Sequence, residues 1–136
     1  MIGGFAVIYG FYPRVTGDID LLIDTALENE ALVYKGLEIL SDKAVRELQP
    51  GEVSQYNVVR VCDEVVVDLM KSACGIDYAE AAKEVIVREV QGVPIPFASA
   101  RLLWRTKKPT HRAKDAADLV FLAEYFRQRG ESPPHA

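Results

Sequence analysis

The sequence Asp18-Ile19-Asp20 constrains this chain more strongly than any other feature. It opens residues 18–24, where apolar side chains occupy alternate positions, a pattern typical of a β-strand. Asp18 and Asp20 should therefore point to the same face of a sheet. Two carboxylates about 5 Å apart repel each other by roughly 3 kcal/mol at an effective dielectric constant near 20. A fold that keeps them together needs a cation, and a divalent metal ion is one such cation.

The bulk composition predicts a soluble protein with one domain. The chain has 136 residues, of which 49% are hydrophobic and 26% are charged. We expect the domain to span residues 1–130 and the polar, proline-rich residues 131–136 to form a disordered tail. The net charge of −4 argues against a protein that binds nucleic acid over its whole surface.

Basic residues are concentrated in one late segment. A site for phosphate and a solvated helix surface both explain such a cluster, and on charge alone the solvated surface is the simpler interpretation. The residues are Arg101, Arg105, Lys107, Lys108, Arg112 and Lys114.

The two cysteines and the N-terminal sequence favour a cytoplasmic location. The spacing of Cys62 and Cys74 matches no zinc or redox motif, so we expect buried, reduced thiols. No basic run followed by an apolar run opens the sequence, so we expect no signal peptide. No apolar stretch approaches the roughly 18 residues that a membrane span needs, and we expect no membrane partner.

Hydrophobic periodicity and turn residues predict an alternation of strands and helices. This order predicts an α/β protein in the broad sense (α+β), with a small mixed β-sheet flanked by helices. The valine-rich strands suggest that the sheet is covered on both faces. The predicted elements are a helix over 5–9, a strand over 18–24, one or two helices over 29–48 capped by Asn29, a hairpin over 57–62 and 64–70, a helix over 77–84 capped by Asp77, strands over 85–90 and 93–97, a helix over 100–106 capped by Ser99, and a helix from 110 or 111 to 130.

Asp68 is the third carboxylate of interest, because it interrupts the apolar run Val65-Val66-Val67 before Leu69. An ionised, unpaired aspartate in a buried strand costs several kcal/mol. It must therefore face a cleft, pair with a base or bind a metal. If the hairpin lies beside the strand that carries Asp18 and Asp20, three carboxylates gather on one face. Such a set can hold two magnesium ions, with the third acid as a metal ligand or a general base.

Gly3 and Gly4 fit the other half of such a site. Glycines at a strand-to-helix turn allow backbone N–H groups to approach a phosphate closely. The N-terminus of the helix that follows favours negative charge.

Two motifs in this order resemble those of a known superfamily. Gly3-Gly4, thirteen further residues and then Asp18-Ile19-Asp20-Leu21 resemble the signature of the DNA polymerase β-like nucleotidyltransferases. The wider stretch, with Gly10 and Arg14-x-Thr16-x-Asp18, is similar to small bacterial members related to abortive-infection toxins. A late segment resembles their Lys…Arg-x-Lys-Asp-x-x-Asp-Leu helix: Lys107 or Lys108, then Arg112-Ala113-Lys114-Asp115 and Asp118-Leu119.

The resemblance implies the nucleotidyltransferase fold and a magnesium-dependent transfer of a nucleoside monophosphate from a nucleoside triphosphate. Asp18 and Asp20 would hold magnesium, and Asp68 would be the third ligand or the general base. The acceptor stays open among RNA, a protein hydroxyl and a small hydroxyl or amine compound.

The resemblance also implies which residues bind the nucleotide. Gly3 and Gly4 would cradle the triphosphate. Arg14 and Thr16 would position their loop or contact a phosphate. Lys114, with Arg112 or Lys107, would neutralise charge on the leaving group, whereas Asp115 would orient a neighbouring group.

Simpler interpretations of these residues stay open. Asp18 and Asp20 could lie in solvent at a strand edge. Asp68 could be a buried acid paired with Arg112 or Lys114. Lys114 and Asp115 could be a solvated helix pair.

The short stretch before the glycines predicts a first strand of two residues and a bare sheet edge, which a second copy or a partner chain could cover. A non-catalytic binding module, such as a toxin–antitoxin partner, is therefore the alternative function. A metal-dependent phosphodiesterase or nuclease would use the same carboxylates.

Overall fold

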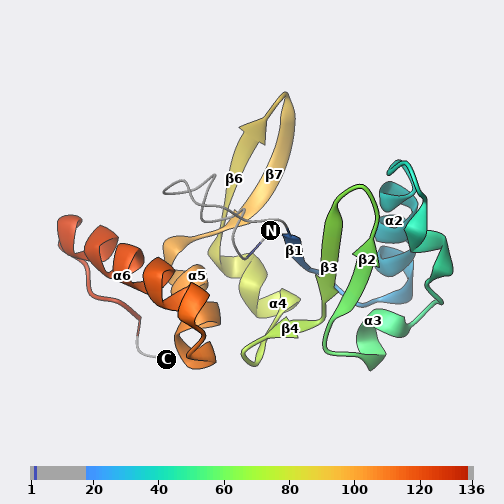
Figure 1. Ribbon diagram of the computed structural model, residues 1–136. Coiled ribbons are helices and arrows are strands. Elements are labelled where there is room, and N and C mark those ends of the chain that lie inside the picture. Colours follow the sequence, from blue (N-terminus) through green and yellow to red (C-terminus); the bar gives the residue numbers. More distant parts are fainter. Residues whose placement is uncertain (1, 3–17, 135–136) are drawn as a thin grey trace.

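The computed structural model describes residue 2 and residues 18–134, which form a mixed α+β protein (Figure 1). The predicted helix over 5–9 lies outside these residues. The elements are β1 (Asp18–Leu22), α2 (Leu27–Leu37), η1 (Ala44–Glu47), α3 (Glu52–Gln55), β2 (Val59–Cys62), β3 (Val66–Met70), β4 (Ser72–Ala73), β5 (Ile76–Asp77), α4 (Tyr78–Ala81), η2 (Ala82–Glu84), β6 (Val85–Val90), β7 (Val93–Ala98), α5 (Ala100–Lys107), η3 (Lys108–Thr110) and α6 (Ala113–Gln128).

A three-stranded sheet in the order β1-β3-β2 forms the centre of the molecule. The predicted hairpin is confirmed, since β2 and β3 are antiparallel neighbours. Strand β1 pairs with β3 in parallel, so the strand that carries Asp18 and Asp20 does lie beside the strand that carries Asp68. Ile2 adds an antiparallel bridge on the other side of β1, where its N–H donates to the Asp20 carbonyl oxygen at 3.0 Å.

One face of this sheet packs on the segment from α2 to α3. Alternate residues of β2 and β3, such as Val61 and Val67, are buried there against α2 and η1. Glu30 of α2 is only 1% exposed, and its carboxylate accepts hydrogen bonds from the Gly51 and Val53 N–H groups. This buried acid therefore ties α2 to the start of α3.

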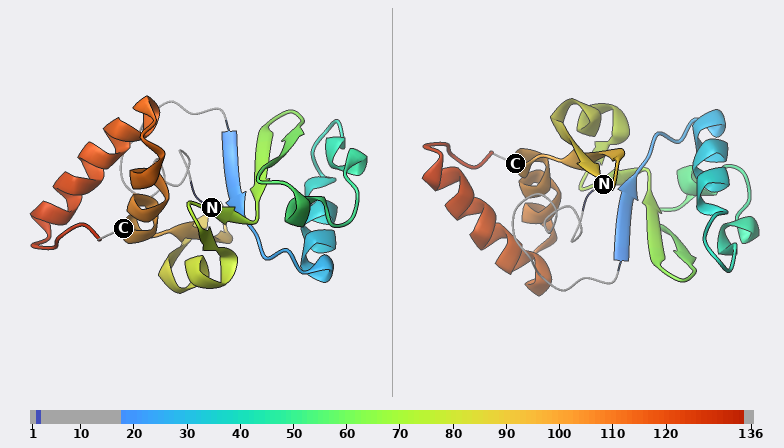
Figure 2. Two further views of the ribbon diagram at one scale, coloured as in Figure 1. Left: turned by 90° about the horizontal axis from the view of Figure 1, so that it is seen from below. Right: turned by 90° about the horizontal axis from the view of Figure 1, so that it is seen from above.

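The opposite face of the sheet is apolar at one end of β1 and acidic at the other. At the C-terminal end of the strands, Leu22 and Met70 pack on a second core that includes Phe97, Leu102 and Phe126. The acidic residues occupy the other end of the same face. Figures 1 and 2 show α5 and α6 at one end of the molecule and α2 and α3 at the other, with the three-stranded sheet between them.

Two of the predicted helix caps are confirmed and one is wrong. The Asp77 and Ser99 side chains accept hydrogen bonds from Glu80 N–H and Leu102 N–H, at the starts of α4 and α5. Asn29 does not cap α2, which begins two residues earlier. The Asn29 amide instead donates to the Asp24 carbonyl oxygen.

A single helix over 29–48 does not form, and the alternative of two helices is closer to the structure, since the short helix η1 follows α2 and contains Ala44 and Val45. Helix α2 ends at Leu37, and the chain then turns through Lys43, whose φ of 50° lies in the left-handed region, before the 3₁₀ turn η1. A residue in that conformation interrupts a right-handed helix.

Strands β6 and β7 form a separate two-stranded hairpin that projects from the body (Figure 1). Gln91 and Gly92 connect them, both with positive φ, as a two-residue hairpin turn requires. Most of the hairpin is exposed, including Val87 and Val93. The expectation of strands covered on both faces is therefore wrong for β6 and β7, because they pair with each other and not with the central sheet.

The expectation of buried cysteines is wrong as well, although both thiols are free. Cys62 ends β2 on the face opposite the buried Val61, and Cys74 lies in the turn between β4 and β5. Within the described residues, no helix is long and apolar enough to cross a membrane.

The turn of the β2–β3 hairpin is held by Asp63. Its carboxylate accepts hydrogen bonds from the N–H groups of Asp42, Ala44 and Glu64 at 2.7–2.9 Å. Partial burial raises the pKa of Asp63, but these three donors outweigh it and hold the pKa below its ordinary value. The charged form therefore joins the hairpin to the segment that precedes η1.

This carboxylate should make stability depend on pH. A folded pKa below the unfolded value of about 3.9 contributes stability above that value, which is lost as the pH falls through the folded pKa. We expect Asp63→Asn to lower the free energy of unfolding at pH 7, and its difference from wild type to shrink below about pH 4. Urea unfolding at several pH values measures this. Asp42→Asn, at an exposed neighbouring carboxyl, should change little at pH 7, and equal losses in the two variants would contradict the assignment.

Candidate active site

The three predicted carboxylates lie on one face of the sheet. Asp20 and Asp68 are directly paired across the parallel strands, and Asp18 is paired with Val66 two positions earlier. Paired residues of neighbouring strands point to the same face, and so do positions i and i+2 of one strand. Asp18, Asp20 and Asp68 therefore share the face that is not packed on α2.

A cation already lies among them. Arg60 of β2 is paired with Asp68 across the antiparallel strands. Its guanidinium donates to both carboxylate oxygens of Asp68, from Nε at 2.9 Å and from Nη2 at 3.1 Å. The same Nη2 lies 3.3 Å from Oδ2 of Asp18. One arginine thus connects two of the three candidate ligands.

Burial differs strongly among these groups. The Asp68 side chain is 9% exposed, whereas those of Asp18 and Arg60 are 42% and 55% exposed. The hydrogen bonds and charge of Asp68, with the charge of Asp18, raise the pKa of the Arg60 guanidinium, so it stays positive at every accessible pH. Asp68 therefore has the partner that a nearly buried carboxylate needs, and the described partner is Arg60 rather than Arg112.

The chemistry of this donor set fits magnesium. Carboxylate oxygens are the ligands that this ion prefers. The positive charge of Arg60 already balances two of the three carboxylates, those of Asp18 and Asp68. Among the described residues, no three His, Cys, Asp or Glu side chains are gathered closely enough to hold a metal ion in the present arrangement. Asp18 and Asp68 are instead turned toward Arg60, and the hydrogen bonds to that guanidinium would have to open before a metal could take their oxygens.

The late basic motif forms a buried ion network. Lys107, only 4% exposed, places Nζ 3.0 Å from Asp115 Oδ1 and 3.0 Å from Asp118 Oδ2. Thr110 and Arg112 also donate to Asp115, at 2.6 and 2.7 Å. These contacts join the end of α5 to the first turns of α6. Lys107 is therefore held inside the protein and cannot neutralise a leaving group.

Asp115 accepts hydrogen bonds from three side chains, those of Lys107, Thr110 and Arg112. Burial raises its pKa, but the hydrogen bonds from Thr110, Lys107 and Arg112 outweigh it and leave the pKa below its ordinary value. Arg112 uses Nε for this contact while 54% of its side chain is exposed. The interpretation of Asp115 as part of a solvated pair is wrong, because it is 1% exposed.

The other predicted nucleotide-binding residues are not described. Gly3, Gly4, Arg14 and Thr16 lie outside the described residues, and so does the side chain of Lys114. Their predicted roles stay predictions. Arg112 is the one member of that set with a described side chain.

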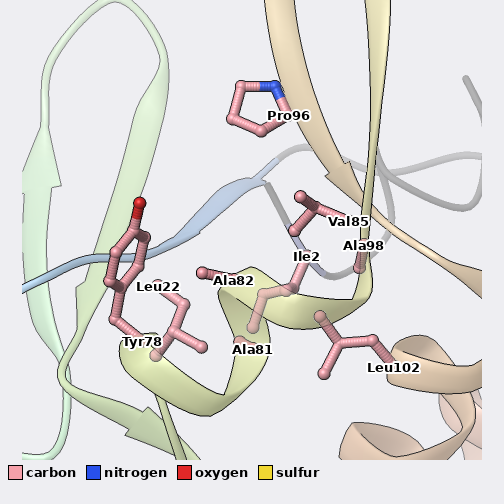
Figure 3. Close-up of a pocket in the computed structure, with 9 residues that line it drawn as sticks. All are labelled: Ile2, Leu22, Tyr78, Ala81, Ala82, Val85, Pro96, Ala98 and Leu102. Carbon is pink, nitrogen blue, oxygen red and sulfur yellow. The ribbon is translucent and has the colours of Figure 1, made fainter.

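An apolar pocket lies farther along the face of β1 that carries the carboxylates (Figure 3). Leu22, two positions after Asp20, lines it together with Ile2, Tyr78 of α4 and Pro96 of β7. The volume is about 160 Å³, and the Tyr78 hydroxyl is the most polar side-chain group in the lining. This pocket can take an apolar or aromatic group, and its described lining residues include no carboxylate and no cation.

Arg60 is the functional candidate that sequence reasoning missed. The observed turn contains Asp63, Glu64 and Val65, and it places residue 60 opposite residue 68. A hairpin centred on Asp63-Glu64, as the sequence predicts, would instead place residue 60 opposite residue 67, so the predicted hairpin did not contain this pairing. The single charge in Val59-Arg60-Val61 was the available signal.

No protein-family model matches this chain, and no curated protein is significantly similar to it.

The buried network should make Lys107 important for stability. Removing one partner of a buried ion pair costs about 3–5 kcal/mol, because the other charge is left without compensation. We expect Lys107→Met to lower the free energy of unfolding by about that amount in a urea titration. Lys108 is the matched control, since it is exposed and its Nζ lies 5.5 Å from the centroid of the Trp104 ring. Lys108→Met should cost less than about 1 kcal/mol, and similar losses in both variants would contradict the assignment.

Proposed function

We propose that this protein is a magnesium-dependent nucleotidyltransferase. The observation that carries the proposal is the register of β1 and β3, which puts Asp20 beside Asp68 and Asp18 on the same face. Three carboxylates from two strands, one of them nearly buried, are costly unless a cation compensates them. The order of the glycine pair, the two aspartates and the basic helix in the sequence supports the same function.

In the proposed reaction, an acceptor oxygen or nitrogen attacks the α-phosphorus of a nucleoside triphosphate. The bond between that phosphorus and the bridging oxygen to the β-phosphate breaks, and pyrophosphate leaves with the electron pair. Bound magnesium would supply charge neutralisation for the phosphates and a lowered pKa for the attacking group. Asp18 and Asp20 would hold it, with Asp68 as third ligand or as acceptor of the proton.

The nucleotide would be bound mainly by residues that precede β1. Gly3 and Gly4 would offer backbone N–H groups to the phosphates, and Arg14 and Thr16 would contact or position them. Arg112 and Lys114, at the start of α6, are the proposed cations for the leaving pyrophosphate. The nucleoside triphosphate is the proposed partner, with RNA, a protein or a small molecule as acceptor, in a cytoplasmic setting.

One observation favours a second candidate, a non-catalytic binding module such as a toxin–antitoxin partner. Arg60 already satisfies both oxygens of Asp68 and contacts Asp18. A fold that had lost catalysis could keep its carboxylates in this way without any metal. The two candidates differ in whether metal and nucleotide bind at all.

Binding of metal with nucleotide should stabilise the folded protein. A ligand at about 100 times its dissociation constant adds about 2.7 kcal/mol, which raises the melting temperature of a domain of this size by roughly 10 °C. We expect this shift with magnesium and at least one of ATP, GTP, CTP or UTP in differential scanning fluorimetry. Asp20→Asn should abolish the shift, because it removes one ligand charge.

Asp24→Asn is the matched control on the same segment. Asp24 follows β1, and its Oδ1 accepts a hydrogen bond from the Ala26 N–H. Asp24 is thus separate from the group formed by Asp18, Asp20 and Asp68. This variant should keep the nucleotide-dependent shift. A wild-type protein that shows no shift with any of the four nucleotides would overturn the catalytic proposal and favour the binding module.

A further inference from the structure

Arg60 places a positive charge beside the carboxylates of Asp18 and Asp68. Its guanidinium makes two hydrogen bonds to Asp68 and one contact with Asp18, which is the geometry of a bidentate arginine–carboxylate pair with an additional acid. A carboxylate oxygen that accepts these bonds cannot at the same time coordinate a metal at full strength. The arginine and a divalent ion therefore compete for the same oxygens.

The position of Arg60 allows it to leave. Strand β2 is an edge strand of the described sheet, and 55% of the Arg60 side chain is exposed. Asp68 is held by β3 between two neighbours and is 9% exposed, so the acid is fixed while its partner can move. The long, flexible side chain of arginine can release its charged end without a change in the backbone.

We propose that Arg60 is a positioning residue that is exchanged for the metal ion. In the metal-free protein Arg60 keeps Asp18 and Asp68 on one face against their mutual repulsion. When a divalent ion enters, the guanidinium leaves the carboxylates and becomes available to the phosphates that arrive with the ion. This inference rests on the proposed function for the identity of the incoming ligand, but the exchange itself concerns only metal and protein.

The exchange predicts a gain of metal affinity on removal of the arginine. Arg60→Gln eliminates the competing cation, and we expect Mn²⁺ alone to bind at least about tenfold more tightly than to wild type in isothermal titration calorimetry. Arg60→Lys keeps the charge but not the two-bond geometry, so its affinity should fall between the two. Arg46→Gln is the control for net charge, because Arg46 is an exposed arginine 3.9 Å from Glu38. That variant should bind Mn²⁺ as wild type does.

A spectroscopic readout follows the exchange directly in wild-type protein. The Nε–H group of Arg60 donates to Asp68, so its ¹H–¹⁵N signal should be protected from solvent exchange. The Arg60→Gln variant lacks the arginine Nε–H group, so the signal missing from its spectrum is assigned to Arg60. Saturation with Mg²⁺ should shift or remove this signal. Arg127 provides an internal control, because its Nε donates to Glu124 at 2.8 Å on α6. The Arg127 signal should not change.

The outcomes separate this inference from the proposed function. If magnesium and a nucleotide stabilise the protein but the Arg60 signal stays unchanged at saturation, the exchange is overturned and the nucleotidyltransferase proposal stands. If Arg60→Gln gains Mn²⁺ affinity while no nucleotide binds to any form, the exchange stands and the proposed function is overturned. Equal Mn²⁺ affinities of wild type and Arg60→Gln, or no detectable binding to either, overturn the exchange.

Discussion

The parallel pairing of β1 with β3 is the constraint on which the rest of the structure depends. It places Asp20 beside Asp68 and leaves Asp18 on the same face. The opposite faces of these strands are buried against α2, so a slip of one residue would turn the carboxylates into a hydrophobic core. Hydrophobic packing on one side thus fixes acidic groups on the other, and electrostatic repulsion among those groups then has to be compensated.

Arg60, on the adjacent strand β2, compensates part of that repulsion. Lys107 likewise compensates the negative charges of Asp115 and Asp118 on α6. The two sites differ in exposure. Lys107 is enclosed and its pairing is structural, whereas Arg60 is half exposed and its pairing can open. A buried pair that joins two helices gives rigidity, and an exposed cation at a face of carboxylates gives a site that can accept another ion. Because of this difference, we propose a functional role for the Arg60 site and assign a structural role to the Lys107 network.

Sequence reasoning succeeded where local pattern decides structure. Alternating apolar residues predicted β1, and valine-rich runs on either side of Asp63-Glu64 predicted the β2–β3 hairpin. The side chains of Asp77 and Ser99 predicted the starts of α4 and α5. It failed where distant contacts decide. The partners of Asp68 and Lys107 depend on which strand or helix folds back on them, and the exposure of the cysteines depends on where strands end. The partner of Asp68 depends on the register of the hairpin, because the turn of three residues at 63–65 places Arg60 opposite Asp68, whereas a turn of two residues at Asp63-Glu64 would place Arg60 opposite Val67.

The central claim is that Asp18, Asp20 and Asp68 form the cation site of this protein. Paramagnetic broadening by substoichiometric Mn²⁺ in a ¹H–¹⁵N spectrum of the full chain tests it most directly, because the effect falls steeply with distance from the bound ion. The account predicts that backbone signals of β1, β3 and the middle of β2 broaden first. Broadening centred on another acidic group, such as Asp63 and Glu64 in the hairpin turn, or no selective broadening at all, would contradict it.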